Sequence, residues 1–169
     1  MAIQRLNHAV LYVRDVDQSA RFYTDVLGFH VVSEFPGAAF LQADGSTNDH
    51  DLGLFQIGSE ARASDAGRGT VGLYHLAWEV DTLGEFERLA GVLADGGHLV
   101  GSSSHGTTKS LYGKDPDGLE FEIAWIIPAH LLTDDDRGAR AGVHPLDIAA
   151  EIARFGRDER SGVGISSPA

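Results

Sequence analysis

The sequence contains no cysteine, and this absence limits the chemistry that the chain can perform. Disulfide bonds, thiolate metal sites and a cysteine nucleophile are all excluded. Any metal site must therefore use nitrogen and oxygen ligands, which histidine and the acidic side chains supply.

Positive charge is also scarce. The chain has 13 Lys and Arg against 25 Asp and Glu, which gives a formal net charge of -12 at pH 7. No Lys- or Arg-rich block offsets this charge, and a negative surface repels nucleic acid and anionic lipid headgroups. We therefore expect no nucleic-acid partner and no membrane partner.

Long apolar runs are missing as well. None approaches the roughly 20 residues needed to span a bilayer, and the start of the chain (MAIQRLNHAV) lacks the basic and apolar regions of a signal peptide. We therefore expect a cytoplasmic protein. Hydrophobic residues make up 43% and charged residues 22% of the 169 residues, which is typical of a folded globular protein.

The first half of the chain carries the signals of a βαβββ unit. An apolar stretch at 6–13 predicts a strand, and Asp15 and Asp17 are candidate N-caps for the amphipathic helix that follows. Gly28 is placed as the C-cap of this helix. Turn signals then separate three further predicted strands, at 29–35, 38–43 and 51–57.

The second half repeats this order. A strand is predicted at 72–80, and Thr82 with Glu85 predicts a capping box at the start of a second helix. The turn Asp115–Gly118 divides the last two strands. The three strands after the helix are predicted at about 98–102, 107–113 and 119–126.

An ungapped shift of 67 residues superposes the two halves. It places His8 on His75 in the opening strands and Leu52 on Leu119 near the ends. An internal duplication is the simplest explanation. The sequence therefore predicts an α+β fold built from two tandem βαβββ modules.

Beyond Ile127 the pattern fades. Residues 133–142 are polar and predict turns, Asp134–Asp136 predict a solvated surface or a helix cap, and 145–155 predict a short helix with an apolar face. We expect this partly helical extension to serve packing or a homo-oligomer contact and to have a frayed end. The predicted organisation is one domain at 1–127, with modules at about 5–58 and 71–127, and a C-terminal extension at 128–169.

Three strings in this order resemble the vicinal oxygen chelate superfamily, which includes glyoxalases, bleomycin-resistance proteins and extradiol ring-cleavage dioxygenases. They are LNHAVLYVRDVDQSARFYTDVLGF at 6–29, LYHLAWEV at 73–80 and KDPDGLEFEI at 114–123. The resemblance implies that the two modules form an open, strand-lined cup with a metal inside. It implies the ligands His8, His75 and Glu122, with Glu120 on the same strand face as the alternative to Glu122.

Two further strings are similar to the extradiol dioxygenases. NDHDLGLF at 48–55 is similar to the strand that carries their acid-base histidine, which maps to His50, with Asp49 in place of a preceding histidine. HGTTKSLYGKDPDG at 105–118 is similar to their stretch from an active-site histidine to a tyrosine, which maps to His105 and Tyr112. The residues alone also allow His50 as an exposed polar residue and Tyr112 as an ordinary strand tyrosine.

The number of ligands separates the chemistries of this superfamily. At the 67-residue offset the counterpart of Glu122 is Phe55, which cannot bind metal, although a slip of one residue would bring Gln56 to that place. A three-ligand site with open positions suits Fe(II), or Mn(II), that must accept both a substrate and O₂. Four ligands, as in glyoxalases, suit proton transfer at Ni or Zn.

The sequence therefore predicts a metal-dependent extradiol-type dioxygenase. Its substrates would be a small aromatic diol of the catechol type and O₂. The alternatives are a lyase or isomerase of the glyoxalase or epimerase type, and a non-catalytic drug-binding protein of the bleomycin-resistance type.

Overall fold

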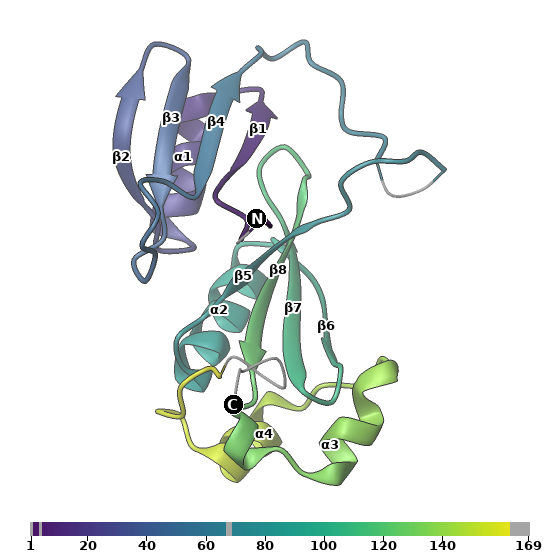
Figure 1. The fold of residues 1–169 in the computed structure, drawn as a ribbon. Helices are drawn as coiled ribbons and strands as arrows, with labels where there is room; N and C mark the ends of the chain where they lie inside the picture. The colour runs from purple at the N-terminus through teal and green to yellow at the C-terminus, as the bar shows by residue number, and fades with distance from the viewer. Residues whose placement is uncertain (1, 4, 67–68, 163–169) are drawn as a thin grey trace. The chain divides into compact units, whose positions relative to one another are not determined.

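The computed structural model describes residues 2–3, 5–66 and 69–162. They divide into two compact units: unit 1 is Met1–Asp65 with Asp115–Leu119, and unit 2 is Ala66–Lys114 with Glu120–Ala169. Each unit contains one four-stranded sheet and at least one helix (Figure 1). The predicted α+β fold with a duplicated βαβββ order is confirmed. None of the helices in the described ranges is long and apolar enough to cross a membrane.

The sheet of unit 1 has the strand order β1-β4-β3-β2, and β1 and β4 run parallel. Helix α1 (Val16–Asp25) begins where Asp15 accepts a hydrogen bond from the Gln18 amide, so this predicted N-cap is confirmed. Leucines of three strands are buried with Phe22 of α1 and form the core of the unit. The strands are β1 (Ala9–Val13), β2 (His30–Phe35), β3 (Ala38–Gln42) and β4 (Leu52–Gln56).

The sheet of unit 2 has the equivalent order β5-β8-β7-β6, with β5 and β8 parallel. Helix α2 (Leu83–Asp95) begins where Thr82 accepts from the Glu85 amide. The carboxylate of Glu85 binds Arg88. It is therefore not directed at the Thr82 amide, which would be the second hydrogen bond of the predicted capping box. The strands are β5 (Leu76–Glu79), β6 (Leu99–Ser104), β7 (Thr108–Lys114) and β8 (Glu120–Ile126).

Both opening strands begin later than the apolar pattern predicted. The ladder between β1 and β4 starts at Ala9, and the ladder between β5 and β8 starts at Leu76. His8 and His75 therefore each lie one residue before a strand and not within it. Their equivalence in the duplication is kept, because each precedes its strand by the same single residue.

The alignment of the two repeats contains a gap, and this corrects the predicted alignment of the closing strands. Ala9 lies opposite Leu52, and its equivalent Leu76 lies opposite Phe121. The offset is therefore 67 residues for the opening strands and 69 for the closing strands, so Leu52 corresponds to Phe121 and not to Leu119. The extra length of the second repeat lies earlier in the chain, because helix α2 is longer than α1 and the turn 105–107 is longer than the turn 36–37. The connection just before the closing strand is instead the shorter one, 115–119 against 43–51.

The C-terminal extension is more helical and more buried than predicted. Thr133 and Asp136 form a capping box that starts a helix in the segment predicted to be turns. Asp136 is only 7% exposed and its carboxylate lies 2.6 Å from Arg154, so of the two predicted alternatives the helix cap holds for this residue and the solvated surface does not. Residues 163–169, which include most of the predicted frayed end, lie outside the described residues. The helices are η1 (Ala129–Leu131), α3 (Asp134–Gly138), η2 (Ala139–Ala141) and α4 (Ile148–Phe155).

The apolar face of α4 packs within unit 2. The Phe155 ring lies 5.3 Å from the ring of Trp125, which is fully buried and donates from Nε1 to the Glu159 carbonyl. This contact accounts for part of the apolar face from which a homo-oligomer was predicted. The predicted division into a 1–127 domain and a 128–169 extension stays a prediction.

A buried ion pair joins the sheet of unit 2 to α4. Lys109 on β7 is 3% exposed, and its Nζ lies 2.8 Å from Oε1 of Glu151 and 2.9 Å from Oγ of Ser104. Removing one partner of a buried pair leaves an uncompensated charge and costs about 3–5 kcal/mol. We expect Glu151→Ala to lower the free energy of unfolding of unit 2 by about 3 kcal/mol. Urea unfolding followed by tryptophan fluorescence measures this, because both tryptophans, Trp78 and Trp125, belong to unit 2.

The matched control replaces both charges. In Lys109→Met/Glu151→Leu no charge is left unpaired, so most of the lost stability should return. A double variant as unstable as Glu151→Ala would show that the loss came from packing and not from the charge.

The Asp136–Arg154 pair should make unit 2 sensitive to acid. The hydrogen bonds from Arg154 to the Asp136 carboxylate hold the pKa of Asp136 far below the ordinary value, which is about 3.9 in an unfolded chain. Because the folded pKa is the lower one, the carboxylate stabilises the fold above about pH 4, and this contribution is lost as the pH falls further. We expect Asp136→Asn to lower the Tm by about 5 °C or more at pH 7 and by less at pH 3, where part of this contribution has been lost. Equal Tm shifts at the two pH values would contradict this assignment.

Candidate metal and substrate site

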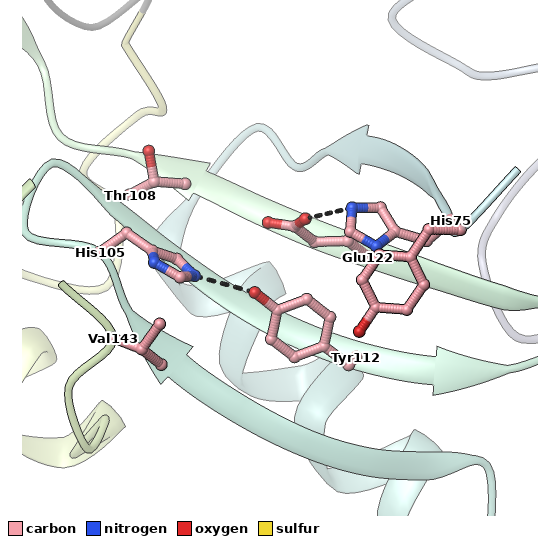
Figure 2. A pocket seen from close by; sticks show the side chains of 7 residues that line it. His75, His105, Thr108, Tyr112, Glu122 and Val143 are labelled. Carbon is pink, nitrogen blue, oxygen red and sulfur yellow. Dashed lines mark hydrogen bonds and ion pairs between the residues drawn. The ribbon is translucent and has the colours of Figure 1, made fainter. Parts of the chain in front are cut away.

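Two of the predicted metal ligands meet in unit 2. Nε2 of His75, just before β5, lies 3.0 Å from Oε2 of Glu122 on β8 (Figure 2). The parallel pairing of the two strands brings them together, because it sets Ala77 opposite Glu122. Both side chains are largely buried, with 25% and 13% of their surfaces exposed.

The spacing of this pair suits a shared metal ion. Two ligand bonds of about 2.1 Å at a right angle place their donor atoms about 3.0 Å apart. One imidazole and one carboxylate are also donors that Fe(II) and Mn(II) accept. Within residues 2–3, 5–66 and 69–162, no group of three or more His, Asp or Glu side chains is gathered around such a position. The pair therefore supplies two candidate ligands.

The surroundings favour Glu122 over Glu120 as the candidate ligand. The Glu120 carboxylate lies 3.8 Å from Nζ of Lys114 and does not line the cavity described below. Glu122 is oriented by Ser110, whose fully buried hydroxyl donates to Oε1 at 2.6 Å. The sequence analysis missed Ser110. The signal was its spacing of two residues from Tyr112, which places both side chains on one face of β7.

His105 and Tyr112 are hydrogen bonded to each other. Nε2 of His105 lies 2.9 Å from the Tyr112 hydroxyl, and Nδ1 lies 3.1 Å from the Gly142 carbonyl. A carbonyl oxygen only accepts, so in the neutral ring Nδ1 carries the proton and Nε2 accepts from the tyrosine. The Ser103 hydroxyl, which is also buried, donates to Tyr112 at 3.3 Å. The tyrosine oxygen is thereby held in place from two sides.

The His75–Glu122 pair, His105 and Tyr112 line one cavity of about 590 Å³. In Figure 2 the Tyr112 ring lies between the His75–Glu122 pair on one side and His105 on the other. Four of the six predicted site residues are therefore brought to one cavity of unit 2. The complete lining is Tyr74, His75, His105, Thr108, Tyr112, Glu122 and Val143.

The other two predicted site residues meet in unit 1. The rings of His8 and His50 are 4.5 Å apart, and the Phe40 ring lies 5.0 Å from His50. Nδ1 of His50 is 3.1 Å from Oδ2 of Asp49, and this hydrogen bond lowers the pKa of Asp49. With its proton on Nδ1, a neutral His50 keeps the lone pair of Nε2 available to accept a proton.

The residue that corresponds to Glu122 is Gly53, which corrects the predicted counterpart, Phe55. Gly53 lies opposite Val10 of β1 and opposite Phe40 of β3, just as Glu122 lies opposite Ala77 of β5 and Tyr112 of β7. The pairing with the opening strands fixes this correspondence, because Val10 and Ala77 are equivalent at the offset of 67 residues. Glycine has no side chain to bind a metal, so the absence of a second acidic ligand at this position stands.

Gln56, the alternative raised by a register slip, is engaged elsewhere. It lies at the end of β4 opposite Val13, and its side-chain oxygen accepts from the Val16 amide at the start of α1 at 3.1 Å. It therefore serves the first turn of that helix.

Comparison with known proteins agrees with this architecture. A family model described as the Glyoxalase/Bleomycin resistance protein/Dioxygenase superfamily matches residues 5–123. The chain belongs to this superfamily. Among solved structures of the superfamily's fold, a glyoxalase/dioxygenase from Nostoc punctiforme is 26% identical, with a TM-score of 0.59 over 72% of this chain and 90% of that one.

Two curated relatives represent different branches of the superfamily. Biphenyl-2,3-diol 1,2-dioxygenase 3 of Rhodococcus globerulus is 38% identical over 122 residues, which are 70% of this chain and 62% of that protein. The chain thus spans less than two thirds of that relative. Lactoylglutathione lyase of Neisseria meningitidis serogroup A is 30% identical over 127 residues, or 70% of this chain and 88% of the lyase.

Proposed function

We propose that this chain is a metal-dependent extradiol-type dioxygenase that cleaves a catecholic ring with O₂. The observation that carries the proposal is the cavity of unit 2, in which the His75–Glu122 pair lies beside Tyr112 and His105. His8 is the proposed third ligand, because it occupies the position equivalent to His75 in the duplication. The identity of 38% to a biphenyl-2,3-diol dioxygenase supports the same reaction class.

The proposed metal is Fe(II), with Mn(II) as the alternative, because two imidazoles and one carboxylate suit either ion. When bound, Fe(II) would supply the electron transfer between the diol and O₂ that ring cleavage requires. His75, His8 and Glu122 would hold it, and Ser110 would keep the carboxylate of Glu122 in its orientation.

The remaining proposed roles belong to hydrogen-bonding side chains. His50 would accept the second hydroxyl proton of the diol at Nε2, since its hydrogen bond to Asp49 directs the ring proton to Nδ1. Tyr112 and His105 would hydrogen bond the substrate oxygens and stabilise the negative charge that develops on them.

A second candidate is a lyase or isomerase of the glyoxalase or epimerase type, which the identity to lactoylglutathione lyase favours. Gly53 argues against it, because a four-ligand site would need a second acidic side chain at that position. A drug-binding protein of the bleomycin-resistance type would not need the metal ligands that the His75–Glu122 pair supplies.

We also propose that the protein is a homo-oligomer, which light scattering after size-exclusion chromatography would test.

The deciding experiment measures oxygen uptake. Protein loaded anaerobically with Fe(II) is mixed with catechol or with biphenyl-2,3-diol in air-saturated buffer. We expect one O₂ to be consumed for each diol, together with a yellow ring-opened product. Glu122→Gln, which keeps the size of the side chain but removes its charge, should fail to consume O₂. No uptake by the wild-type protein with either diol would refute the proposal, and isomerisation of a glutathione hemithioacetal with Ni(II) or Zn(II) would establish the second candidate.

A further inference from the structure

The C-terminal extension reaches the cavity of unit 2. Residues 142–144 run beside the end of β6, where His144 and Ser104 exchange two backbone hydrogen bonds of 2.9 Å. This bridge holds the preceding residue, Val143, against the cavity that contains His75 and Glu122. The extension therefore contributes to the wall of the cavity as well as to the core of the unit.

The extension also clamps the loop that carries His105. Gly106 has a φ of 70°, and a Cβ added there would lie 2.3 Å from the Asp136 carbonyl oxygen and 2.9 Å from the Arg140 amide nitrogen. Only glycine allows this close approach of two backbones. The position of His105 is thus set by the extension on one side and by β7 on the other.

Gly142 determines which nitrogen of His105 carries the proton. Its carbonyl accepts from Nδ1 at 3.1 Å, so Nε2 of the neutral ring is left to accept from the Tyr112 hydroxyl. Without this carbonyl, the ring could place its proton on Nε2 and present a donor to the tyrosine. The backbone of the extension therefore acts on the cavity through His105.

Val143 stands at the far end of the cavity from the candidate ligands. In Figure 2 it lies next to His105, while His75 and Glu122 lie on the other side of the Tyr112 ring. The residue is 74% exposed, so its substitution should leave the core of the unit unchanged. A substrate whose two oxygens point to the His75–Glu122 pair would direct its remaining bulk toward Val143.

We infer that residues 142–144 are a functional wall of the substrate cavity, in which Gly142 holds His105 in the Nδ1–H tautomer and Val143 limits the size of the aromatic diol. The role of Val143 rests on the proposed function, since it assumes a diol in this cavity. The role of Gly142 does not, because the tautomer is a property of the protein alone.

Affinity measurements test the role of Val143. Isothermal titration of the Fe(II)-loaded protein under argon gives the affinities of catechol and biphenyl-2,3-diol without turnover. Val143→Phe should weaken binding of biphenyl-2,3-diol relative to catechol by about tenfold, and Val143→Ala should leave the ratio within about threefold. Val100→Phe, which alters another exposed valine of unit 2 that does not line the cavity, is the matched control.

The outcomes separate this inference from the proposed function. A ratio that changes less than threefold in Val143→Phe, or no binding of either diol to the wild-type protein, overturns the role of Val143. A changed ratio in a protein that consumes no O₂ upholds it and refutes only the dioxygenase assignment.

Nitrogen NMR of the histidine rings tests the role of Gly142. In ¹⁵N-histidine-labelled, metal-free protein at alkaline pH, we expect His105 to show a proton on Nδ1 and a proton-free Nε2. Loss of the signal set in His105→Asn assigns it. A proton on Nε2 of the wild-type ring would overturn the role of Gly142.

Discussion

His75→Ala should remove both the metal and the activity. The substitution deletes one of the two donor atoms that lie 3.0 Å apart and leaves the Glu122 carboxylate with its hydrogen bond to Ser110 alone. Loss of a residue that only supports a ligand costs about 10- to 100-fold in metal affinity, so loss of a ligand should exceed this. Metal content after gel filtration with equal added Fe(II), and oxygen uptake with catechol, measure the two effects.

The matched control is His130→Ala, which removes an exposed histidine of η1 that does not line the cavity. It should retain the metal and the rate. Full metal retention by His75→Ala would refute its role as a ligand. Full retention by Glu122→Ala would assign the carboxylate ligand to another residue, first to Glu120.

His50→Ala should retain the metal and lose turnover by about 10²- to 10⁴-fold, which is the range for loss of a general base. The effect should fall on kcat, because the proposed proton transfer takes place after the diol has bound. Steady-state oxygen uptake together with metal analysis distinguishes this variant from His75→Ala.

Asp49→Asn offers a weaker companion to His50→Ala. It removes the carboxylate that orients the His50 ring but keeps a hydrogen-bond acceptor, and its side chain is 78% exposed, so the loss should be much smaller. A His50→Ala protein that turns over at the wild-type rate would exclude the acid-base role.

Local patterns in the sequence were sufficient to predict the order of strands and helices, and the resemblance to the superfamily supplied four of the seven residues that line the cavity. Strand alternation and capping residues such as Asp15 depend on neighbours a few positions away, and the sequence displays these directly. The equivalence of His8 and His75 was also visible, because no insertion lies between the start of each module and its histidine.

Features that depend on connection length or on distant partners were not predictable in this way. The offset changes from 67 at the opening strands to 69 at the closing strands because the second repeat is longer between the two, so the counterpart of Glu122 was assigned to Phe55 when it is Gly53. Asp136 is buried only because Arg154 lies beside it in the folded chain. The contact between Gly142 and His105 uses a backbone carbonyl, which no residue type reveals.

Glycine at position 53 also determines the net charge of the metal and its ligands in the proposed centre. Two neutral imidazoles and a single carboxylate leave a divalent cation with one uncompensated positive charge, whereas an acidic side chain at position 53 would cancel it. A diol that has lost one proton brings the one negative charge that restores neutrality. In the proposed centre, the absence of a side chain at position 53 would therefore favour an anionic substrate.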